Sequence, residues 1–398
     1  MVFFGKLSVM KLQPLRVVVS LDVRHRASQN AIAGILRFAA AHPEWDLQMR
    51  GNHPSNDGFA VEADWMPDGL IIDDGWRTRE GERLIASPAL KGIIFASTVP
   101  PRVCSPAHDV LVTDDRSLAA AAAQLFIGHG MKNFAFVGSG QEERWSDARE
   151  CFFREILAEE KLPLHVYPHP RRGKTRWKSE FNALAAWIAA LPKPCGIWAA
   201  HDQRAKHILD VCRLTKIKVP EQVQVLGVDD ETYICDQTFP PLSSIAPDFE
   251  RGGYAAAEAL HSMMNGFAAK TGRLSIPLKT VTQRLSTTDI SGAGMRVAHA
   301  CEIIRRNACR KISVRMIVRE VGGSERLLEK NFKSVLGHSI IREIQNRKLN
   351  MVRQMLSKTA SPLGAIAADC GFNSENYLKN LFKRRFGMTM SEFRRKVR

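Results

Sequence analysis

Between Leu15 and about Ser286 the sequence alternates two patterns, and this alternation limits the possible folds more than any other feature. Short runs of consecutive apolar residues, such as "LRVVVSL", "GLIID", "NFAFVG" and "VQVLGV", are separated by longer stretches with helical spacing, such as "NAIAGILRFAAAH" and "RAKHILDVCRL". Continuous apolar strands that alternate with helices are typical of βαβ units, in which helices cover both faces of a parallel sheet. We therefore predict an α/β fold with parallel sheets over residues 1–286.

The rest of the chain differs in both pattern and charge. After the polar stretch "LSTTDISGAG", which predicts a linker over 287–295, no strand pattern recurs, so residues 296–398 are predicted to be all-α. Residues 287–398 hold 23 Lys and Arg against 9 Asp and Glu, which is +14 of the chain's net +16. Such one-sided charge is typical of a module that binds a polyanion. A merely basic, solvated helical domain would carry the same charge.

The helical region contains an internal repeat with an offset of 50. The segments "VGGSERLLEKNFKSVLG" (321–337) and "CGFNSENYLKNLFKRRFG" (370–387) each follow a short apolar helix. The matched pairs are Leu328 and Leu378, Phe332 and Phe382, and Gly337 and Gly387. A helix, a tight turn with Gly and a second helix opened by a capping Ser or Asn is the helix-turn-helix pattern. Leu and Phe four residues apart anchor the second helix and leave its opposite face free.

With its paired units and the stretch "IAADCGFNSENYLKNLFKRRFGMTMSEFRR", residues 296–398 resemble the DNA-binding domain of AraC-family transcription regulators. One departure is Met390, where that family usually has Pro. In such units the start of the second helix enters the major groove. The residues predicted to reach base edges are Arg326, Glu329, Lys330, Glu375, Asn376, Lys379 and Asn380. Lys333, Lys383, Arg384 and Arg385 are predicted to meet phosphates. Any one of them could instead be an ordinary solvated side chain.

The stretch from 196 to 245, "GIWAAHDQRAKHILDVC" through "VQVLGVDD" to "PPLSSI", resembles the C-terminal lobe of the periplasmic-binding-protein-like domain of LacI-family repressors. The resemblance covers about 15–286 and implies two lobes with a small molecule between them, at the carboxyl ends of the strands. Matching the motifs residue by residue, Arg149, Asp202 and Asp229 fall on positions that hydrogen-bond a sugar. Trp145 would stack on the sugar, and Asp22 is the candidate of the N-terminal lobe. Each Asp could instead be a helix N-cap or a strand-end turn.

A LacI-type ligand-binding region followed by an AraC-type DNA-binding domain resembles the architecture of sugar-responsive activators of pentose catabolism. The resemblance implies D-xylose or a related sugar as effector, and no cofactor. Its implied partners are promoter or operator DNA, a second copy of the chain, and RNA polymerase. The N-terminal region lacks the pattern of a signal peptide, no apolar run is long enough for a membrane span, and the eight Cys are scattered, so we expect a cytoplasmic protein.

Other functions are open from the residues alone. The paired acids Asp73 and Asp74, Asp114 and Asp115, or Asp229 and Asp230 raise the alternative of a glycoside hydrolase. Adjacent residues on a strand point to opposite faces, however, and the sequence has no GxSxG or HExxH motif, so we predict no enzyme activity. A regulator of the same architecture that responds to a different sugar, or a sugar-binding module without a DNA-dependent function, is the remaining alternative.

Overall fold

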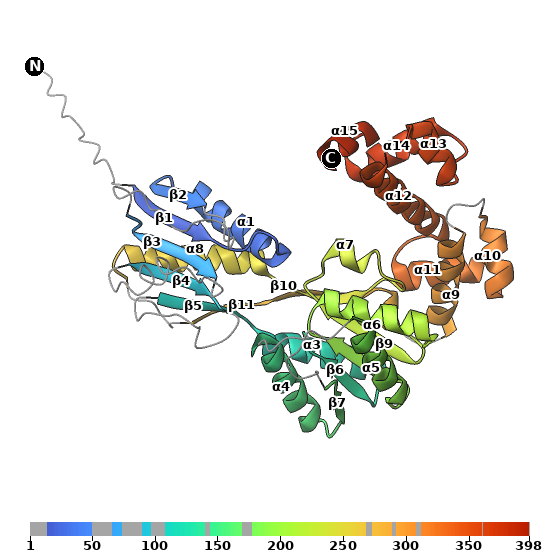
Figure 1. The fold of residues 1–398 in the computed structure, drawn as a ribbon, viewed down its shortest axis with the longest axis horizontal. Coiled ribbons are helices and arrows are strands. Elements are labelled where there is room, and N and C mark those ends of the chain that lie inside the picture. The colour runs from blue at the N-terminus through green and yellow to red at the C-terminus, as the bar shows by residue number, and fades with distance from the viewer. Residues whose placement is uncertain are drawn as a thin grey trace, which may run out of the picture. The chain divides into compact units, whose positions relative to one another are not determined.

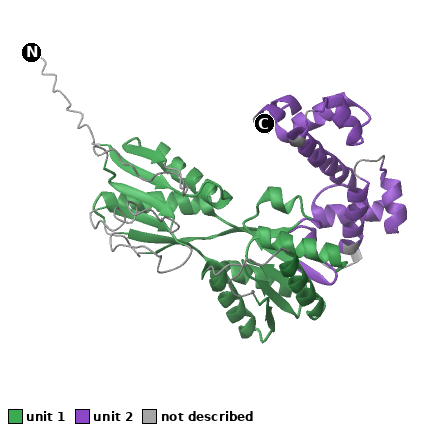
Figure 2. Ribbon diagram, viewed as in Figure 1, with its two compact units in different colours: residues 1–217, 225–238, 242–282 green, residues 218–224, 239–241, 283–398 purple. Residues whose placement is uncertain are grey.

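The computed structural model describes residues 14–49, 66–73, 90–96, 108–139, 144–168, 177–267, 273–288, 292–307, 312–359 and 361–397. The chain divides into two compact units, shown in green and purple in Figure 2. The first unit holds residues 1–217, 225–238 and 242–282, and the second holds residues 218–224, 239–241 and 283–398. The second unit therefore takes in two short segments that the sequence places among the strands of the α/β region.

The first unit contains two six-stranded sheets, one in each of two lobes. The N-terminal lobe has the strand order β11-β5-β4-β3-β1-β2, and all its neighbouring strands pair in parallel. Its elements are β1 (Leu15–Ser20), α1 (Arg26–Ala40), β2 (Trp45–Met49), β3 (Gly69–Asp73), β4 (Lys91–Phe95), β5 (His108–Thr113), α8 (Phe249–Met264) and β11 (Arg273–Ile276). The strands are short apolar runs because both faces of the sheet are buried, as the fully buried Val17, Ile71 and Ile93 show.

The C-terminal lobe has the order β12-β10-β9-β8-β6-β7, in which β12 runs antiparallel to β10, whereas β10 with β9, β8 with β6 and β6 with β7 are parallel pairs. Its strands are β6 (Phe134–Val137), β7 (Leu164–Val166), β8 (Cys195–Ala199), β9 (Val223–Val228), β10 (Ser243–Pro247) and β12 (Leu278–Thr282). Its helices are α3 (Asp115–Gly128), α4 (Arg144–Glu159), α5 (Trp177–Ala190), α6 (Asp202–Thr215) and α7 (Thr232–Cys235). The chain passes between the lobes after β5, after β10 and after β11, so each lobe is built from separate stretches of sequence (Figure 1).

Helices α1 and α8 pack alongside each other at very short range against the N-terminal sheet. A Cβ atom added at Gly253 would lie 1.9 Å from the carbonyl oxygen of Ala31, and one at Gly34 would lie 1.9 Å from that of Glu250. Two glycines on facing helices thus let the two backbones approach each other directly. Because the neighbouring atoms belong to backbone, no side-chain movement could make room for a larger residue at either position.

The second unit is helical. It begins with the 3-10 turn η1 (Leu285–Thr287), followed by α9 (Gly292–Arg306), α10 (Val314–Val321), α11 (Glu325–Leu336), α12 (Ile340–Lys358), α13 (Leu363–Asp369), α14 (Glu375–Phe386) and α15 (Met390–Val397). The two predicted helix-turn-helix units are α10 with α11 and α13 with α14, and α12 joins them. The two halves of the sequence repeat have the same residues at the two ends of their second helices. Ser324 and Ser374 cap the second helices, and Gly337 and Gly387 end them with φ of 68° and 69°.

Each helix-turn-helix unit has its own apolar core. The first core contains Ile317, Leu328 and Phe332, together with Leu285 and residues of α9. The second contains Ile366, Leu378 and Phe382 with Met390, which starts α15 at the position where the family usually has Pro. Helix α12 contributes its first turns to one core and its remaining turns to the other.

The predicted fold class, two parallel α/β lobes followed by an all-α region with two helix-turn-helix units, is confirmed. The predicted linker at 287–295 is partly helix, because α9 begins at Gly292, and residues 289–291 lie outside the described residues. Within the described part of the chain, no helix is long and apolar enough to cross a membrane.

Candidate ligand site and nucleic-acid interface

Arg149 is held rigidly at the edge of the C-terminal sheet where the parallel strands end. It lies on α4 and is only 5 % exposed. Its Nε donates to Asp115 Oδ1 at 2.9 Å, and its Nη1 donates to the carbonyl oxygen of Ala200, directly after β8. The remaining Nη2 has no partner among the residues that the structure describes. The guanidinium is therefore fixed in position with one nitrogen left to bind a ligand.

Two rings lie next to this guanidinium. The Arg149 guanidinium carbon is 4.8 Å from the centre of the Trp145 ring, and the Trp145 and His201 ring centres are 5.9 Å apart. His201 caps α6, and its Nδ1 accepts a hydrogen bond from the backbone N–H of Arg204 at 3.3 Å. Burial, followed by the charge of Arg149, lowers the pKa of His201 to about 4. A neutral imidazole whose Nδ1 is an acceptor carries its proton on Nε2, so His201 offers one further donor.

Asp229 follows β9 in a strained backbone conformation. Its φ is 104°, and that of Asp230 is 48°, values that residues other than Gly seldom adopt. The backbone N–H of Asp229 donates to the carbonyl oxygen of Ile245 at 2.8 Å, and that of Asp230 donates to Ser244 Oγ at 3.0 Å. The Asp230 carboxylate accepts from Thr282 Oγ1 at 2.8 Å. Strained non-glycine residues held by such bonds cluster at ligand sites.

The carboxylate of Asp229 accepts no hydrogen bond from any described residue. Burial raises the pKa of this carboxyl from its usual value near 3.8 to about 6, although the nearby Arg149 favours the charged form. The residue as a whole keeps partial exposure. A carboxylate that has lost part of its hydration and gained no donor is an acceptor suited to the hydroxyl groups of a bound molecule.

Asp202 has a different environment from the one predicted. It is 1 % exposed, and its carboxylate accepts from Ser244 Oγ at 2.6 Å, from the backbone N–H of Glu231 at 2.8 Å and from Cys235 Sγ at 3.4 Å. Gly227 makes room for it, since a Cβ there would lie 2.1 Å from Asp202 Oδ1. Burial, and then the charge of Asp229, raise the pKa of Asp202 well above its usual value. Its oxygens are used inside the protein, so we interpret Asp202 as holding the Asp229 loop in place.

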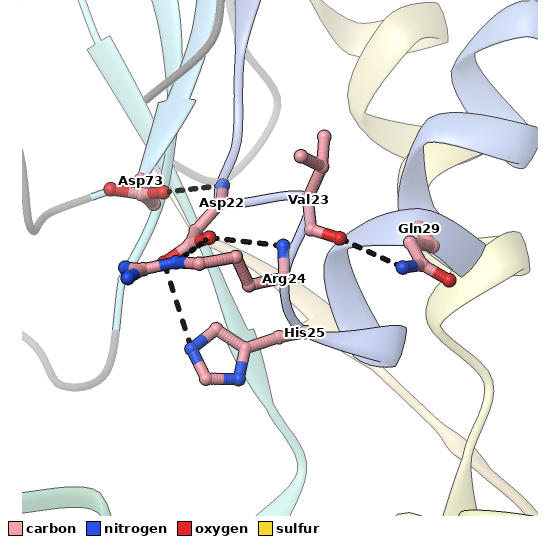
Figure 3. A network of polar contacts seen from close by, with 6 residues as sticks. All are labelled: Asp22, Val23, Arg24, His25, Gln29 and Asp73. Carbon is pink, nitrogen blue, oxygen red and sulfur yellow. Dashed lines mark hydrogen bonds and ion pairs between the residues drawn. The ribbon is translucent and has the colours of Figure 1, made fainter. Parts of the chain in front are cut away.

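Asp22 lies on the other lobe, at the end of β1 (Figure 3). Its carboxylate accepts from the backbone N–H of Arg24 at 3.0 Å and from Arg24 Nε at 2.9 Å, while His25 Nε2 lies 3.6 Å away. Its own backbone N–H donates to Asp73 Oδ2 at 3.0 Å. The Arg24 hydrogen bond lowers the pKa of Asp22 to about 2. Asp22 therefore has a cation of its own, while Arg149, Trp145 and Asp229 form a group on the C-terminal lobe.

One group of residues in the described chain has the composition of a metal site. His42, Glu44 and His261 of the N-terminal lobe place their ligand atoms within 4.8 Å of one another. Trp45 Nε1, which can only donate, lies 3.0 Å from His261 Nδ1. This bond puts the His261 proton on Nε2, the nitrogen 3.8 Å from Glu44 Oε1. A protonated nitrogen cannot bind a metal, so the geometry favours a hydrogen-bonded cluster that joins α1, β2 and α8.

In the first helix-turn-helix unit, α11 presents part of the predicted set to solvent. Arg326, Lys330 and Lys333 are exposed. Glu329 is partly buried, and its Oε2 accepts from the backbone N–H of Ile340 at 3.2 Å. Because that N–H opens α12, the Glu329 carboxylate stabilises the start of the joining helix. Its predicted role in reaching a base edge competes with this contact.

In the second helix-turn-helix unit, α14 carries the predicted residues on one exposed face. Asn376, Lys379, Asn380, Lys383 and Arg384 are all exposed, while Leu378 and Phe382 face the core. Glu375 is partly buried and lies 2.5 Å from Lys379 Nζ. The helix thus separates an apolar anchor from a polar face whose first two turns each carry an amide, Asn376 and Asn380, and whose last turn is basic. This order suits base edges at the start of the helix and phosphates further along.

Sequence and fold comparisons agree with this division. A model of the periplasmic binding protein-like domain matches residues 123–287, and one of the helix-turn-helix domain matches residues 317–396. The chain is 30% identical over 382 residues to the xylose operon regulatory protein of Escherichia coli K12, covering 95% of this chain and 96% of that protein. The corresponding protein of Haemophilus influenzae is 32% identical over 390 residues, covering 96% and 98%.

Solved structures give the same result. The structure of the xylose-binding transcription activator XylR aligns with a TM-score of 0.63 and 29% identity, covering 95% of this chain and 97% of that one. The regulator CelR in complex with cellobiose aligns over 68% of this chain with a TM-score of 0.53, which at 17% identity shows the fold alone. The full-length relatives show that this chain belongs to the family of xylose operon regulatory proteins, non-enzymatic transcription regulators that join a sugar-binding, periplasmic-binding-protein-like domain to an AraC-type helix-turn-helix domain.

Proposed function

We propose that this regulator binds D-xylose at the Arg149, Trp145 and Asp229 group and activates genes of pentose catabolism in response. The observation that carries the proposal is the carboxylate of Asp229, which is partly removed from water, has no donor among the described residues, and lies in a strained loop near Arg149. A sugar hydroxyl that donates to Asp229 would satisfy this carboxylate. Arg149 Nη2 and His201 Nε2 would donate to other sugar oxygens.

The remaining contacts follow from the chemistry of a pyranose. Trp145 offers a flat apolar surface for the C–H face of the ring. Arg24 and His25, which extend from the loop after β1, are exposed and would reach the sugar from the N-terminal lobe when the lobes close over it. Asp22 would then act by orienting Arg24, and Asp202 by orienting Asp229.

The assignment to xylose rests on the relatives. The Escherichia coli and Haemophilus influenzae proteins are xylose operon regulatory proteins, and the similar solved structure is that of a xylose-binding activator. At about 30% identity the pocket residues of this chain could favour another pentose, so the sugar is the first thing to test. Two copies of the chain on operator DNA, with RNA polymerase as the activated partner, complete the proposed function.

A thermal-shift panel of D-xylose, L-arabinose, D-ribose and D-glucose tests the effector. A ligand at a hundredfold excess over its Kd stabilises the fold by about 2.7 kcal/mol, so the true effector should stand out. Asp229→Ala should weaken its binding by about 1–3 kcal/mol, because the partner hydroxyl then stays unpaired. A response to the hexose alone would refute the xylose assignment, and no response to any sugar would refute this site as a sugar site.

Calorimetric titration of the sugar with and without operator DNA tests the regulatory part. If sugar and operator favour the same state, each must tighten binding of the other by the same factor, typically 5–150-fold. Equal sugar affinities in the two titrations would show that the two functions are independent.

A further inference from the structure

The path between the two functions can be followed from Asp229 along the chain. Ten residues after Asp229, residues 239–241 leave the first unit and belong to the second (Figure 2). They are followed by β10, which returns to the C-terminal lobe and carries Ser244, a hydrogen-bond partner of Asp202. The segment 229–241 therefore begins at the proposed sugar site and ends inside the helical unit.

This segment is braced along its length. At its start Asp202 accepts from the Glu231 N–H at 2.8 Å and from Cys235 Sγ. Within it, Thr238 Oγ1 donates to the Cys235 carbonyl oxygen at 3.0 Å, and the Thr238 N–H donates to that of Ile234 at 3.1 Å. The Leu242 N–H closes the loop by donating to the same Cys235 oxygen at 2.9 Å. These bonds restrict the torsions between Asp229 and residues 239–241, so the segment is suited to pass on a displacement at Asp229.

The far end of the segment contacts α9. The guanidinium carbon of Arg305 lies 4.3 Å from the centre of the Phe239 ring. Arg305 is also held by two hydrogen bonds that its Nε and Nη2 donate to the Glu302 carboxylate, at 3.1 and 2.7 Å. Beside this stack, the Ser286 N–H donates to the Pro241 carbonyl oxygen at 3.0 Å. The segment is thus attached to the helical unit at two neighbouring points, one a cation–π contact and one a backbone hydrogen bond.

From these two points the contacts lead to one recognition helix only. Leu285, next to Ser286, is buried in the first apolar core with Ile304 of α9 and with Leu328 and Phe332 of α11. The core beneath α14 is separate and contains no residue of α9. A shift of residues 239–241 would therefore be felt by α11 before α14.

We propose that residues 229–241 transmit sugar binding to the first helix-turn-helix unit, and that the stack of Phe239 on Arg305 is the contact through which α9 and α11 respond. The proposal rests on the proposed function, since it names the route by which the same sugar site regulates DNA binding. It makes Phe239 and Arg305 positioning residues that touch neither sugar nor DNA.

The test uses the full-length chain and the neighbouring pair Arg305 and Arg306. Both side chains bond Glu302, and both are arginines of the last turn of α9, but only Arg305 stacks on Phe239. D-xylose affinity is measured with and without operator DNA for wild type, Arg305→Ala and Arg306→Ala. Arg305→Ala should lower the coupling factor at least fivefold without changing sugar affinity in the absence of DNA, whereas Arg306→Ala, which removes the same charge, should leave the factor within twofold of wild type.

A second variant changes the other partner of the contact, so that a loss of coupling is not mistaken for misfolding of the Arg305 variant. Phe239→Leu keeps an apolar side chain but removes the ring, so it should reproduce the loss of coupling. If wild type couples and both Arg305→Ala and Phe239→Leu couple equally well, the proposed route is refuted while the proposed function stands. If wild type binds sugar and operator without coupling, the regulatory function fails and the route fails with it. Base changes in the operator half read by α11 should alter the effect of sugar more than changes in the half read by α14.

Discussion

Replacing Asp229 by Asn should stabilise the sugar-free protein. The folded-state pKa of this carboxyl, about 6, lies above its unfolded value near 3.8, so the folded protein holds the proton more tightly. The protonated carboxyl group therefore contributes to the stability of the fold at pH below 4, and this contribution is lost as the pH rises through 6. At 1.36 kcal/mol per pH unit, the charged form costs about 3 kcal/mol at neutral pH. The partial exposure of Asp229 reduces this cost of ionisation to about 1–2 kcal/mol. An Asn side chain is uncharged at every pH, so the variant avoids the cost.

Tryptophan fluorescence gives a clean assay because all seven tryptophans lie between residues 45 and 198, in the first unit. Urea unfolding followed at pH 7.5 therefore reports the sugar-binding unit alone. Asp229→Asn should be more stable than wild type by about 1–2 kcal/mol at pH 7.5, and this gain should shrink markedly at pH 4.5. The exposed Glu258, changed to Gln on α8, is the matched control and should show neither effect.

Two results would refute this reasoning. The first is an Asp229→Asn protein no more stable than wild type at pH 7.5, which would mean that the carboxylate is adequately solvated in the free protein. The second is a gain in stability that is the same at both pH values, which would point to a cause other than charge. In either case the Asp229 carboxylate would not be a poorly solvated acceptor that awaits a ligand. A stabilised variant that has also lost sugar binding would show stability given up for function.

Further outcomes follow for DNA binding and for the fold. Asn376→Ala should relax discrimination at one operator base position by about 1–3 kcal/mol in competition binding, whereas Lys383→Ala should weaken specific and random duplexes alike and lower the salt slope by about 1; equal losses for both variants would mean that the register on α14 is wrong. Gly253→Ala should cost about 3 kcal/mol or more in the same fluorescence assay, since its Cβ would lie 1.9 Å from the Ala31 oxygen. Gly128→Ala, whose Cβ meets nothing within 4 Å, should leave stability unchanged or raise it.

The elements whose signals are local were predictable. Apolar runs such as "LRVVVS" became the buried strands, and the repeat with offset 50 became two helices capped by Ser324 and Ser374. The residues of these patterns lie within a few positions of one another, so propensity and periodicity act in the same direction. The basic exposed face of α14 followed from the same spacing.

Contacts between distant residues decided what the sequence could not show. Asp202 matched a ligand-binding position, yet its carboxylate is used by Glu231 and Ser244, 29 and 42 residues away. Glu329 looked like a free side chain of a recognition helix but binds the first turn of α12. His201, which we propose as a donor to the sugar, was not among the predicted residues, although its place just after a strand and just before a helix start was a usable signal. Hydrogen bonding of this kind depends on the tertiary fold, which periodicity does not encode.

The two short segments 218–224 and 239–241 also bear on how such a protein can be assembled from parts. A gene fusion that joined an unrelated ligand-binding domain to the helical region at residue 283 would leave Ser286 and Arg305 without Pro241 and Phe239. The product would contain both binding activities but only a covalent tether between them. On the proposed route, grafting a new effector specificity onto this DNA-binding region requires that residues 239–241 travel with the helices, and a chimera that keeps them is the one expected to remain inducible.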